Sequence, residues 1–241
     1  MKGATALLAR NLGVRGSLDV DLYRADRRDI AEADLRRAAD LDLGDWFQFQ
    51  VDVETAVAGN AVRFPIRAII GGMVWVAFQV DLVGPGIVMT GQPDDVPPLA
   101  RGVIPEVEQS GYRAYRLVDH VADKVAAMYE LHGATRMPSA RYRDLVDLVA
   151  IATGASVRAE QQGTAIRSEF ERRDLLVPNS FGVPDPSLWV PGYAAEVGRS
   201  LLNIASTLDE AIACVGLLVN PILEKTASGQ WDPEARVWRI P

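Results

Sequence analysis

The chain lacks three features that would place it outside the cytoplasm. Cys214 is the single cysteine among 241 residues, so an intramolecular disulfide is impossible and a reducing compartment is favoured. No uninterrupted apolar run approaches the roughly 20 residues of a membrane-spanning helix. The N-terminal stretch MKGATALLARNLG has no signal-peptide cleavage site. These absences predict a cytoplasmic protein without a membrane segment, and we expect it to be a monomer.

Positive charge is also scarce, above all as lysine. The formal net charge is −7, and lysine occurs only at positions 2, 124 and 225, whereas lysine and arginine together number 25. This balance excludes a protein that coats nucleic acid, so any contact with nucleic acid would come from local groups of arginines. The candidate groups are Arg24, Arg27 and Arg28, and the segment RMPSARYR at residues 136–143.

The hydrophobic pattern changes near residue 100. The first part predicts helices at residues 4–12 and 26–41 and strands at 17–23, 46–55, 62–70 and 73–84. The last three strands are expected to form an antiparallel meander. A loop rich in proline and glycine follows, and then helices over residues 115–133 and 139–154, with Gly133 as a C-cap and Ser139 as an N-cap. We therefore predict an α+β protein with a core at residues 1–100 and a helical domain at residues 101–241.

The strand at residues 17–23 carries two carboxylates on one face. Side chains two residues apart on a strand point to the same side, with Cα atoms about 6.5 to 7 Å apart. Asp19 and Asp21 therefore share one face, while Val20 and Leu22 share the other. Two such carboxylates repel each other unless a positive charge lies between them, and hard oxygen ligands favour Mg²⁺ or Mn²⁺. The alternative is a solvated strand that carries two acids and binds no metal.

A third carboxylate, Asp81, lies inside the apolar run FQVDLVG. An unpaired carboxylate in such a place costs several kcal/mol, which indicates a partner. If this strand lies beside the strand at residues 17–23, three aspartates converge on one metal site. Asp52, in QVDVE, competes for this role, but its neighbouring glutamines predict a solvent-exposed position.

Two further features suit phosphate binding. The turn at Gly3 and Ala4 leads into a helix that Thr5 can cap, and the free N–H groups of a helix start attract phosphate. The alternative is an ordinary helix start. Lys124 lies beside apolar positions of a predicted helix. Its compact ammonium either serves as a point charge on a phosphate or reaches solvent past its apolar stem.

The last polar residues of interest are Asp144, Asp147 and Ser17. The segment RYRDLVDL places Asp144 and Asp147 three residues apart on one side of a helix, and the simplest interpretation is a solvated face with salt bridges. The Ser17 hydroxyl is expected to tie down the end of the first strand. Alternatively, it accepts a phosphoryl group whose charge would repel a triphosphate.

Five segments together resemble the AbiEii/AbiGii toxin family of nucleotidyltransferases, which includes mycobacterial toxins that modify tRNA. In the family's order, and between residue 2 and about residue 153, these are KGATAL, RGSLDVDLY, FQVDLVG, DHVADKVAAM and RYRDLVDL. Ala4 replaces the second small residue of the family's glycine-rich turn. Family members generally have a helix before that turn, so either the start lies upstream of Met1 or this member lacks the helix.

The resemblance implies a DNA polymerase β-like nucleotidyltransferase core, with a mixed or antiparallel sheet and helices, followed by a helical C-terminal domain that contributes to the site. It implies a nucleoside triphosphate bound with Mg²⁺ (or Mn²⁺). Asp19, Asp21 and Asp81 would hold the metal, and Asp81 would deprotonate the attacking hydroxyl. Lys124 would neutralise the phosphates, and Asp144 matches the acid of the last segment. The other substrate-binding residues would be Gly3, Ala4, Thr5, Ser17 and Asp147.

The function implied by the resemblance is that of a metal-dependent nucleotidyltransferase toxin from a toxin–antitoxin or phage-defence pair. Its acceptor would be RNA, at the 3′ end of tRNA, so that translation or growth stops, and a cognate antitoxin would be encoded nearby. The net charge of −7 favours a first alternative, in which a small molecule or a protein is the acceptor. The second alternative is a degenerate, non-catalytic binding member.

Overall fold

The computed structural model describes residues 1–17, 19–56, 61–84, 86–98 and 110–240. The chain forms two compact units, and each is assembled from separate stretches of sequence. The first unit comprises Met1–Asn11, Gly16–Ile87 and Asp94–Tyr115. The second unit comprises Leu12–Arg15, Val88–Pro93 and Arg116–Pro241.

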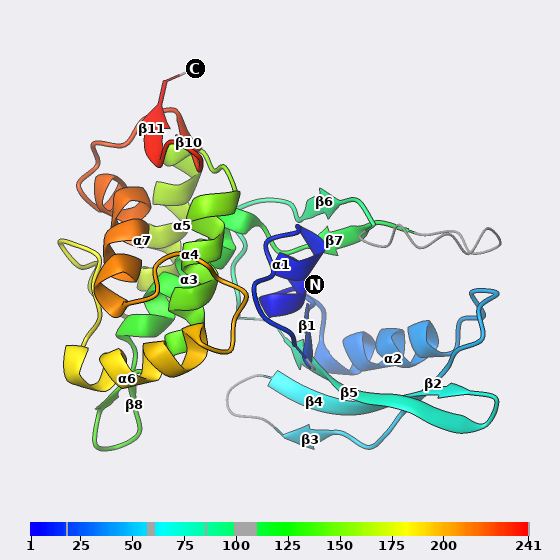
Figure 1. Ribbon diagram of the computed structural model, residues 1–241. Helices are drawn as coiled ribbons and strands as arrows, with labels where there is room; N and C mark the ends of the chain where they lie inside the picture. Colours follow the sequence, from blue (N-terminus) through cyan, green and yellow to red (C-terminus); the bar gives the residue numbers. More distant parts are fainter. Residues whose placement is uncertain (18, 57–60, 85, 99–109, 241) are drawn as a thin grey trace. The chain divides into compact units, whose positions relative to one another are not determined.

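The first unit is built on a mixed sheet (Figure 1). Its strands are β1 (Asp19–Tyr23), β2 (Gln48–Val51), β3 (Thr55–Ala56), β4 (Ala61–Ile70) and β5 (Met73–Val83). The strand order is β1-β5-β4-β2, and β3 pairs with β4. All pairs are antiparallel except β1 with β5, which is parallel. The predicted antiparallel meander is confirmed, and the parallel strand β1 makes the sheet mixed.

Alternation along the strands gives the sheet one apolar face and one polar face. The apolar face packs against helix α2 (Arg28–Ala39), which Figure 1 shows running along the sheet. Its buried residues are Ala31, Val62, Phe64, Ile66, Val80 and Leu82. Because successive side chains of a strand point to opposite faces, Asp19, Asp21, Arg63 and Asp81 belong to the polar face.

Three short elements complete the first unit: α1 (Gly3–Ala9), β6 (Asp94–Val96) and β7 (Tyr112–Ala114). A second apolar cluster joins them, made of Ala6, Ala9, Val96 and Ala114. The backbone N–H of Tyr115 donates to the carbonyl of Met1 over 2.7 Å, so α1 is tied to the β6–β7 hairpin by a main-chain bond as well as by apolar contact.

The second unit is mainly helical. Its helices are α3 (Leu117–Tyr129), α4 (Tyr142–Gly154), α5 (Ala159–Arg172), α6 (Pro186–Val197) and α7 (Leu208–Leu223). Its two hairpins are β8 (Leu131–His132) with β9 (Met137–Pro138), and β10 (Gln230–Asp232) with β11 (Val237–Arg239). No helix in the described part of the chain is long and apolar enough to cross a membrane.

Helices α3 and α4 form the interior of this unit. All residues from Val118 to Met128 and from Asp144 to Ala152 are buried. Polar side chains within these two stretches have left water and therefore need partners inside the protein. This requirement explains why the buried charged side chains of α3 and α4 form ion pairs.

Three of the expected helix caps are wrong. Helix α1 begins after Lys2, and Thr5 lies inside it without capping it. Helix α3 ends at Tyr129, and Gly133, with φ at +71°, lies in the turn of the β8–β9 hairpin. Helix α4 begins after Arg141, and Ser139 is fully buried without capping it. The hairpin uses the backbone of residues 131–138 for strand pairing, so neither helix extends into it. The predicted end of α4 at Gly154 is confirmed.

Phe64 is completely buried in the core of the sheet, and its replacement by alanine should destabilise the first unit. We expect Phe64→Ala to lower the free energy of unfolding by about 3–5 kcal/mol, because it removes a large buried ring and leaves a cavity. Trp75→Ala, at a side chain that is 73% exposed, should change it by less than about 0.5 kcal/mol. Urea denaturation followed by circular dichroism measures both, and equal losses would contradict the assigned core.

Candidate active site

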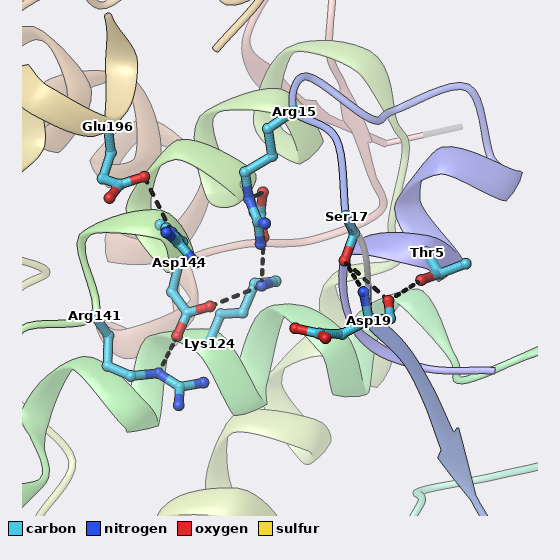
Figure 2. A network of polar contacts seen from close by, with 10 residues as sticks. Thr5, Arg15, Ser17, Asp19, Lys124, Arg141, Asp144 and Glu196 are labelled. Carbon is cyan, nitrogen blue, oxygen red and sulfur yellow. Dashed lines mark hydrogen bonds and ion pairs between the residues drawn. The ribbon is translucent and has the colours of Figure 1, made fainter. Parts of the chain in front are cut away.

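The start of β1 is held by two hydroxyl groups. Thr5 Oγ1 and Ser17 Oγ each donate a hydrogen bond of 2.9 Å to the backbone carbonyl of Asp19, and Ser17 Oγ accepts one of 3.3 Å from the Asp19 N–H (Figure 2). These bonds use the main chain of Asp19 and leave its carboxylate out. The expectation that Ser17 ties down a strand end is confirmed.

Gly3 provides space for the carboxylate of Asp21. The N–H of Lys2 donates to the backbone carbonyl of Asp21 over 2.7 Å, which draws the N-terminal turn onto β1. Gly3 has φ at +66°, and a Cβ atom there would lie 1.8 Å from Asp21 Oδ2. No side chain fits, so the turn requires glycine both for its backbone conformation and for this close approach. Ala4, the next residue, is buried.

Asp81 lies directly beside Asp21 and is paired with an arginine that the sequence analysis did not single out. In the sheet register Asp21 is opposite Asp81, and Asp81 is opposite Arg63 of β4. The Arg63 guanidinium donates two hydrogen bonds of 2.7 Å, one to each oxygen of Asp81. This hydrogen bonding raises the pKa of Arg63, and the charges of Asp19 and Asp21 add to the effect. The apolar run around Asp81 indicated a partner but not which one.

The carboxylates differ in how far they are available to a metal ion. The Asp19 carboxylate makes no hydrogen bond or ion pair with any other residue that the structure describes. Asp81 has both oxygens engaged by Arg63. Accordingly, the described residues contain no group of three or more histidine, cysteine, aspartate or glutamate side chains that could hold a metal. Asp19 and Asp21 nevertheless suit Mg²⁺, which proteins commonly hold through one or two carboxylates together with substrate phosphates.

Asp52, the competitor for the role of third carboxylate, has a different partner. Its Oδ1 accepts a hydrogen bond of 2.6 Å from Arg67 Nη2, and its side chain is 35% exposed. The prediction that Asp52 lies near solvent is consistent with this exposure. It belongs to an ion pair at the other end of β4.

The second unit contains a buried ion cluster centred on Lys124. The Lys124 ammonium donates to Asp144 Oδ1 over 2.8 Å and to Asp147 Oδ2 over 2.7 Å, and Figure 2 shows it directed at Asp144. The three side chains are 2–7% exposed. Lys124 therefore does not reach solvent past its stem, and Asp144 and Asp147 are not on a solvated face. Those two alternative interpretations are wrong because these stretches of α3 and α4 are buried throughout.

Two arginines complete this ion cluster. Arg15 donates two hydrogen bonds to Asp147, of 3.0 Å from Nε and 2.9 Å from Nη2. Arg141 Nε donates one of 2.5 Å to Asp144 Oδ2. The cluster thus has three cations and two carboxylates, a surplus of one positive charge. From the sequence, Arg15 was only part of the RGSLDVDLY segment, and Arg141 was part of RMPSARYR, which was offered for nucleic-acid contact.

Opposite charges set the protonation of this cluster. Burial by itself would lower the pKa of Lys124, but the charges of Asp144 and Asp147 outweigh it and raise that pKa. Burial by itself would raise the pKa of Asp144, but Lys124 and Arg141 outweigh it and lower that pKa. At neutral pH the ammonium and the carboxylate are both charged.

The fold is similar to that of a solved nucleotidyltransferase toxin. Among solved structures, MenT4, a nucleotidyltransferase toxin from Mycobacterium tuberculosis H37Rv, is similar with a TM-score of 0.57 and 14% sequence identity, over 92% of this chain and 74% of the MenT4 chain. At that identity the likeness shows the fold. The expected α+β class, with a nucleotidyltransferase core and C-terminal helices, is confirmed.

The family is shown by the sequence itself. Residues 1–211 match the model of a family described as nucleotidyl transferase AbiEii toxin, type IV toxin–antitoxin system. The chain belongs to the AbiEii nucleotidyltransferase toxins, as the resemblance implied. No curated protein sequence matches it.

Removing Lys124 should destabilise the protein, since it leaves two carboxylates buried. We expect Lys124→Met to lower the free energy of unfolding by about 3 kcal/mol or more. Arg143→Ala serves as the control, because the Arg143 side chain is 64% exposed and its pair with Glu196 contributes at most about 1 kcal/mol. Chemical denaturation of both variants measures this, and a Lys124→Met variant as stable as the control would contradict the buried cluster.

The pKa of Asp144 also predicts how stability depends on pH. A lowered pKa contributes stability that is present above the pKa of an unfolded aspartate, about 3.9, and is lost as the pH falls through the folded pKa. The raised pKa of Lys124 contributes below about 10.4 and is lost as the pH rises further. The stability advantage of wild type over Asp144→Asn should therefore be constant between about pH 5 and pH 9 and shrink below about pH 4. Denaturation across this pH range would show an advantage that changes near neutrality if the assignment were wrong.

Proposed function

We propose that this chain transfers a nucleotide from a nucleoside triphosphate to an RNA acceptor, at the 3′ end of tRNA, and so stops growth until a cognate antitoxin counteracts it. The observation that carries the proposal is the polar face of the sheet. Asp19 and Asp21 project from β1, and Asp81 lies beside them on β5, in a chain of the AbiEii nucleotidyltransferase family. MenT4, which has a similar fold, is described as a nucleotidyltransferase toxin.

Asp19 and Asp21 would hold the metal ion, Mg²⁺ or Mn²⁺. Their oxygens are hard ligands on a rigid strand, and the Asp19 carboxylate has no partner among the described residues that the metal would have to displace. When bound, the metal stabilises the negative charge that develops on the transferring phosphoryl group and on the leaving pyrophosphate. Electrostatic stabilisation of this kind is the main contribution of a protein to phosphoryl transfer.

Asp81 would be the third carboxylate and accept the proton of the attacking hydroxyl. Arg63 fixes its orientation through the two hydrogen bonds of 2.7 Å, and each oxygen keeps a second lone pair that can take up the proton. Arg63 is therefore proposed as a positioning residue for Asp81. It also offsets the repulsion between Asp81 and Asp21, which lie next to each other in the sheet.

The N-terminal turn of the first unit would bind the triphosphate. Gly3 and Ala4 contribute backbone, since Gly3 has no side chain and Ala4 is buried. Thr5 and Ser17 act through the main chain of Asp19, to which both donate. Within the second unit, the cluster around Lys124, Asp144 and Asp147 has a surplus positive charge, which suits it to neutralise phosphate groups.

A protein or a small molecule is the second candidate acceptor, and one observation favours it. The three arginines that the sequence offered for RNA binding near the N-terminus each form an ion pair: Arg24 with Asp26 and Asp34, Arg27 with Asp29, and Arg28 with Glu54. Their charges are therefore largely offset, and the net charge is −7.

One experiment separates the acceptors. Purified protein is incubated with each α-labelled nucleoside triphosphate, Mg²⁺ and total tRNA, and the products are separated by size and by protease and nuclease treatment. Label in nuclease-sensitive tRNA supports the proposal. Label only in protein or in small molecules contradicts the RNA acceptor and supports the second candidate. A parallel reaction without Mg²⁺ tests the metal requirement.

Asp19→Asn should separate catalysis from stability. We expect nucleotide transfer to fall by about a hundredfold or more, since a metal ligand is lost, while the free energy of unfolding changes by less than about 0.5 kcal/mol. Asp52→Asn is the matched control, because it also removes one carboxylate from the first unit but should leave transfer intact. Calorimetric titration with Mn²⁺ gives a second readout, and unchanged Mn²⁺ affinity and transfer in Asp19→Asn would place the chemistry elsewhere.

A further inference from the structure

The helical unit contains a basic cavity that the proposed chemistry does not use. The cavity has a volume of about 440 Å³ and lies where α5 begins and where the chain leaves α7. Its polar lining consists of Arg158, Glu160, Arg167, Lys225 and Ser228. Three of these side chains are cations and one is an anion, so the cavity carries a local excess of positive charge in a chain of net charge −7.

The three cations have no acidic partner among the residues that the structure describes. Arg158, Arg167 and Lys225 are exposed and form no ion pair with any residue in the part of the chain that the structure covers. The Arg167 guanidinium makes one hydrogen bond, of 3.3 Å, to the hydroxyl of Thr164. Elsewhere the surface arginines of the two groups chosen from the sequence are mostly paired, for example Arg141 with Asp144. Cations left unpaired around one cavity are available to a ligand.

The wall of the cavity formed by α5 makes room for a guanidinium. Gly163 lies inside this helix, where glycine is less favourable than alanine. A Cβ atom at Gly163 would lie 3.3 Å from Nη1 of Arg167, closer than an ordinary contact. The missing side chain therefore lets the Arg167 guanidinium lie against the helix, beside the cavity.

The opposite wall is fixed by main-chain hydrogen bonds. After α7, the N–H groups of Thr226 and Ala227 donate to the carbonyl of Pro221 over 2.8 and 2.9 Å. The N–H of Ala159, the first residue of α5, donates to the carbonyl of Gly229 over 3.0 Å. The cavity is thus built between two anchored segments, and the positive end of the α5 dipole adds to its attraction for anions.

We propose that this cavity binds a phosphate group, and that in the cell the phosphate belongs to the backbone of the RNA acceptor. Arginine forks and a lysine ammonium are the side chains that bind phosphate oxygens, and a few hundred cubic ångströms accommodate a phosphate with its sugar. The assignment to RNA, unlike the phosphate chemistry, rests on the proposed function. The cavity supplies positive charge, whereas the charges of the arginines near the N-terminus are offset by their acidic partners.

Binding of labelled tRNA to the full chain tests the proposal. Fluorescence anisotropy without nucleoside triphosphate, at several salt concentrations, measures affinity independently of transfer. For Arg158→Gln, Arg167→Gln and Lys225→Gln we expect the Kd to rise by about three- to tenfold each, and the slope of log affinity against log salt to fall by about 0.7 to 0.9. All three residues are exposed, so the three variants should fold like the wild type.

Two control variants separate an effect of the cavity from a general effect of charge. Arg27→Gln removes the same charge from an arginine that is 81% exposed and paired with Asp29, and it should leave the affinity nearly unchanged. Glu160→Gln removes the acidic group of the cavity and should tighten binding. If the cavity variants bind tRNA no more weakly than Arg27→Gln, the RNA assignment is overturned.

A second arm identifies the source of the phosphate. Inorganic phosphate and pyrophosphate are titrated calorimetrically into wild type and Arg167→Gln. Loss of phosphate binding in the variant with unchanged tRNA affinity would assign the cavity to a free anion and overturn its RNA role. Unchanged binding of both ligands would overturn the phosphate site itself. Neither result affects nucleotide transfer by Asp19 and Asp21, so failure of this proposal is distinguishable from failure of the proposed function.

Discussion

The buried ammonium of Lys124 is the interaction on which the helical unit depends. Helices α3 and α4 are buried along almost their whole length, and Asp144 and Asp147 are buried with them. An isolated carboxylate in such surroundings would cost several kcal/mol, and two near each other would also repel. Lys124 satisfies both, with Arg15 and Arg141 on the outer sides. The same contacts that hold the helices together leave a surplus of one positive charge.

The first unit solves the corresponding problem on a sheet. Its apolar face packs against α2, and its polar face collects Asp19, Asp21 and Asp81. Arg63 compensates Asp81 with two hydrogen bonds, whereas the Asp19 carboxylate has no such partner in the part of the chain that the structure describes. A sheet that neutralises Asp81 and leaves the Asp19 carboxylate without such a partner among the described residues is suited to a metal bound together with substrate phosphates. Strand pairing, more than any single side chain, creates this difference.

Charge is distributed unevenly over this acidic chain. The arginines near the N-terminus that looked like basic ground are paired with acids, and so are Arg141 and Arg143 of the later segment. The cations around the α5 cavity, at positions 158, 167 and 225, form no ion pair with the residues that the structure describes. A net charge of −7 is therefore compatible with a local phosphate site, because exposed charges more than about 10 Å apart are largely screened from one another.

Much of the fold and part of the site could be predicted from the sequence. Period-two alternation determined β4 and β5 and put Asp19 and Asp21 on one face, since that pattern is local. Asp81 lies inside the apolar run FQVDLVG, so its neighbours indicated burial, and burial of a carboxylate indicated that it has a partner. The wrong predictions have two causes. The caps at Gly133 and Ser139 failed because a local hairpin, β8–β9, separates α3 from α4. The cap at Thr5 and the solvated face of Asp144 and Asp147 failed because those residues contact distant segments.

The sequence by itself determined the family and the main strands, because these depend on neighbouring residues and on their order, and it also supplied the candidate acids. Only the tertiary structure decided the partners. Arg63 reaches Asp81 through the β4–β5 register, Arg15 reaches Asp147 across 132 positions, and Arg158, Arg167 and Lys225 meet at one cavity. Ion pairs and cavities depend on which segments come together in space. The spacing of residues along the chain does not show which distant segments will be in contact.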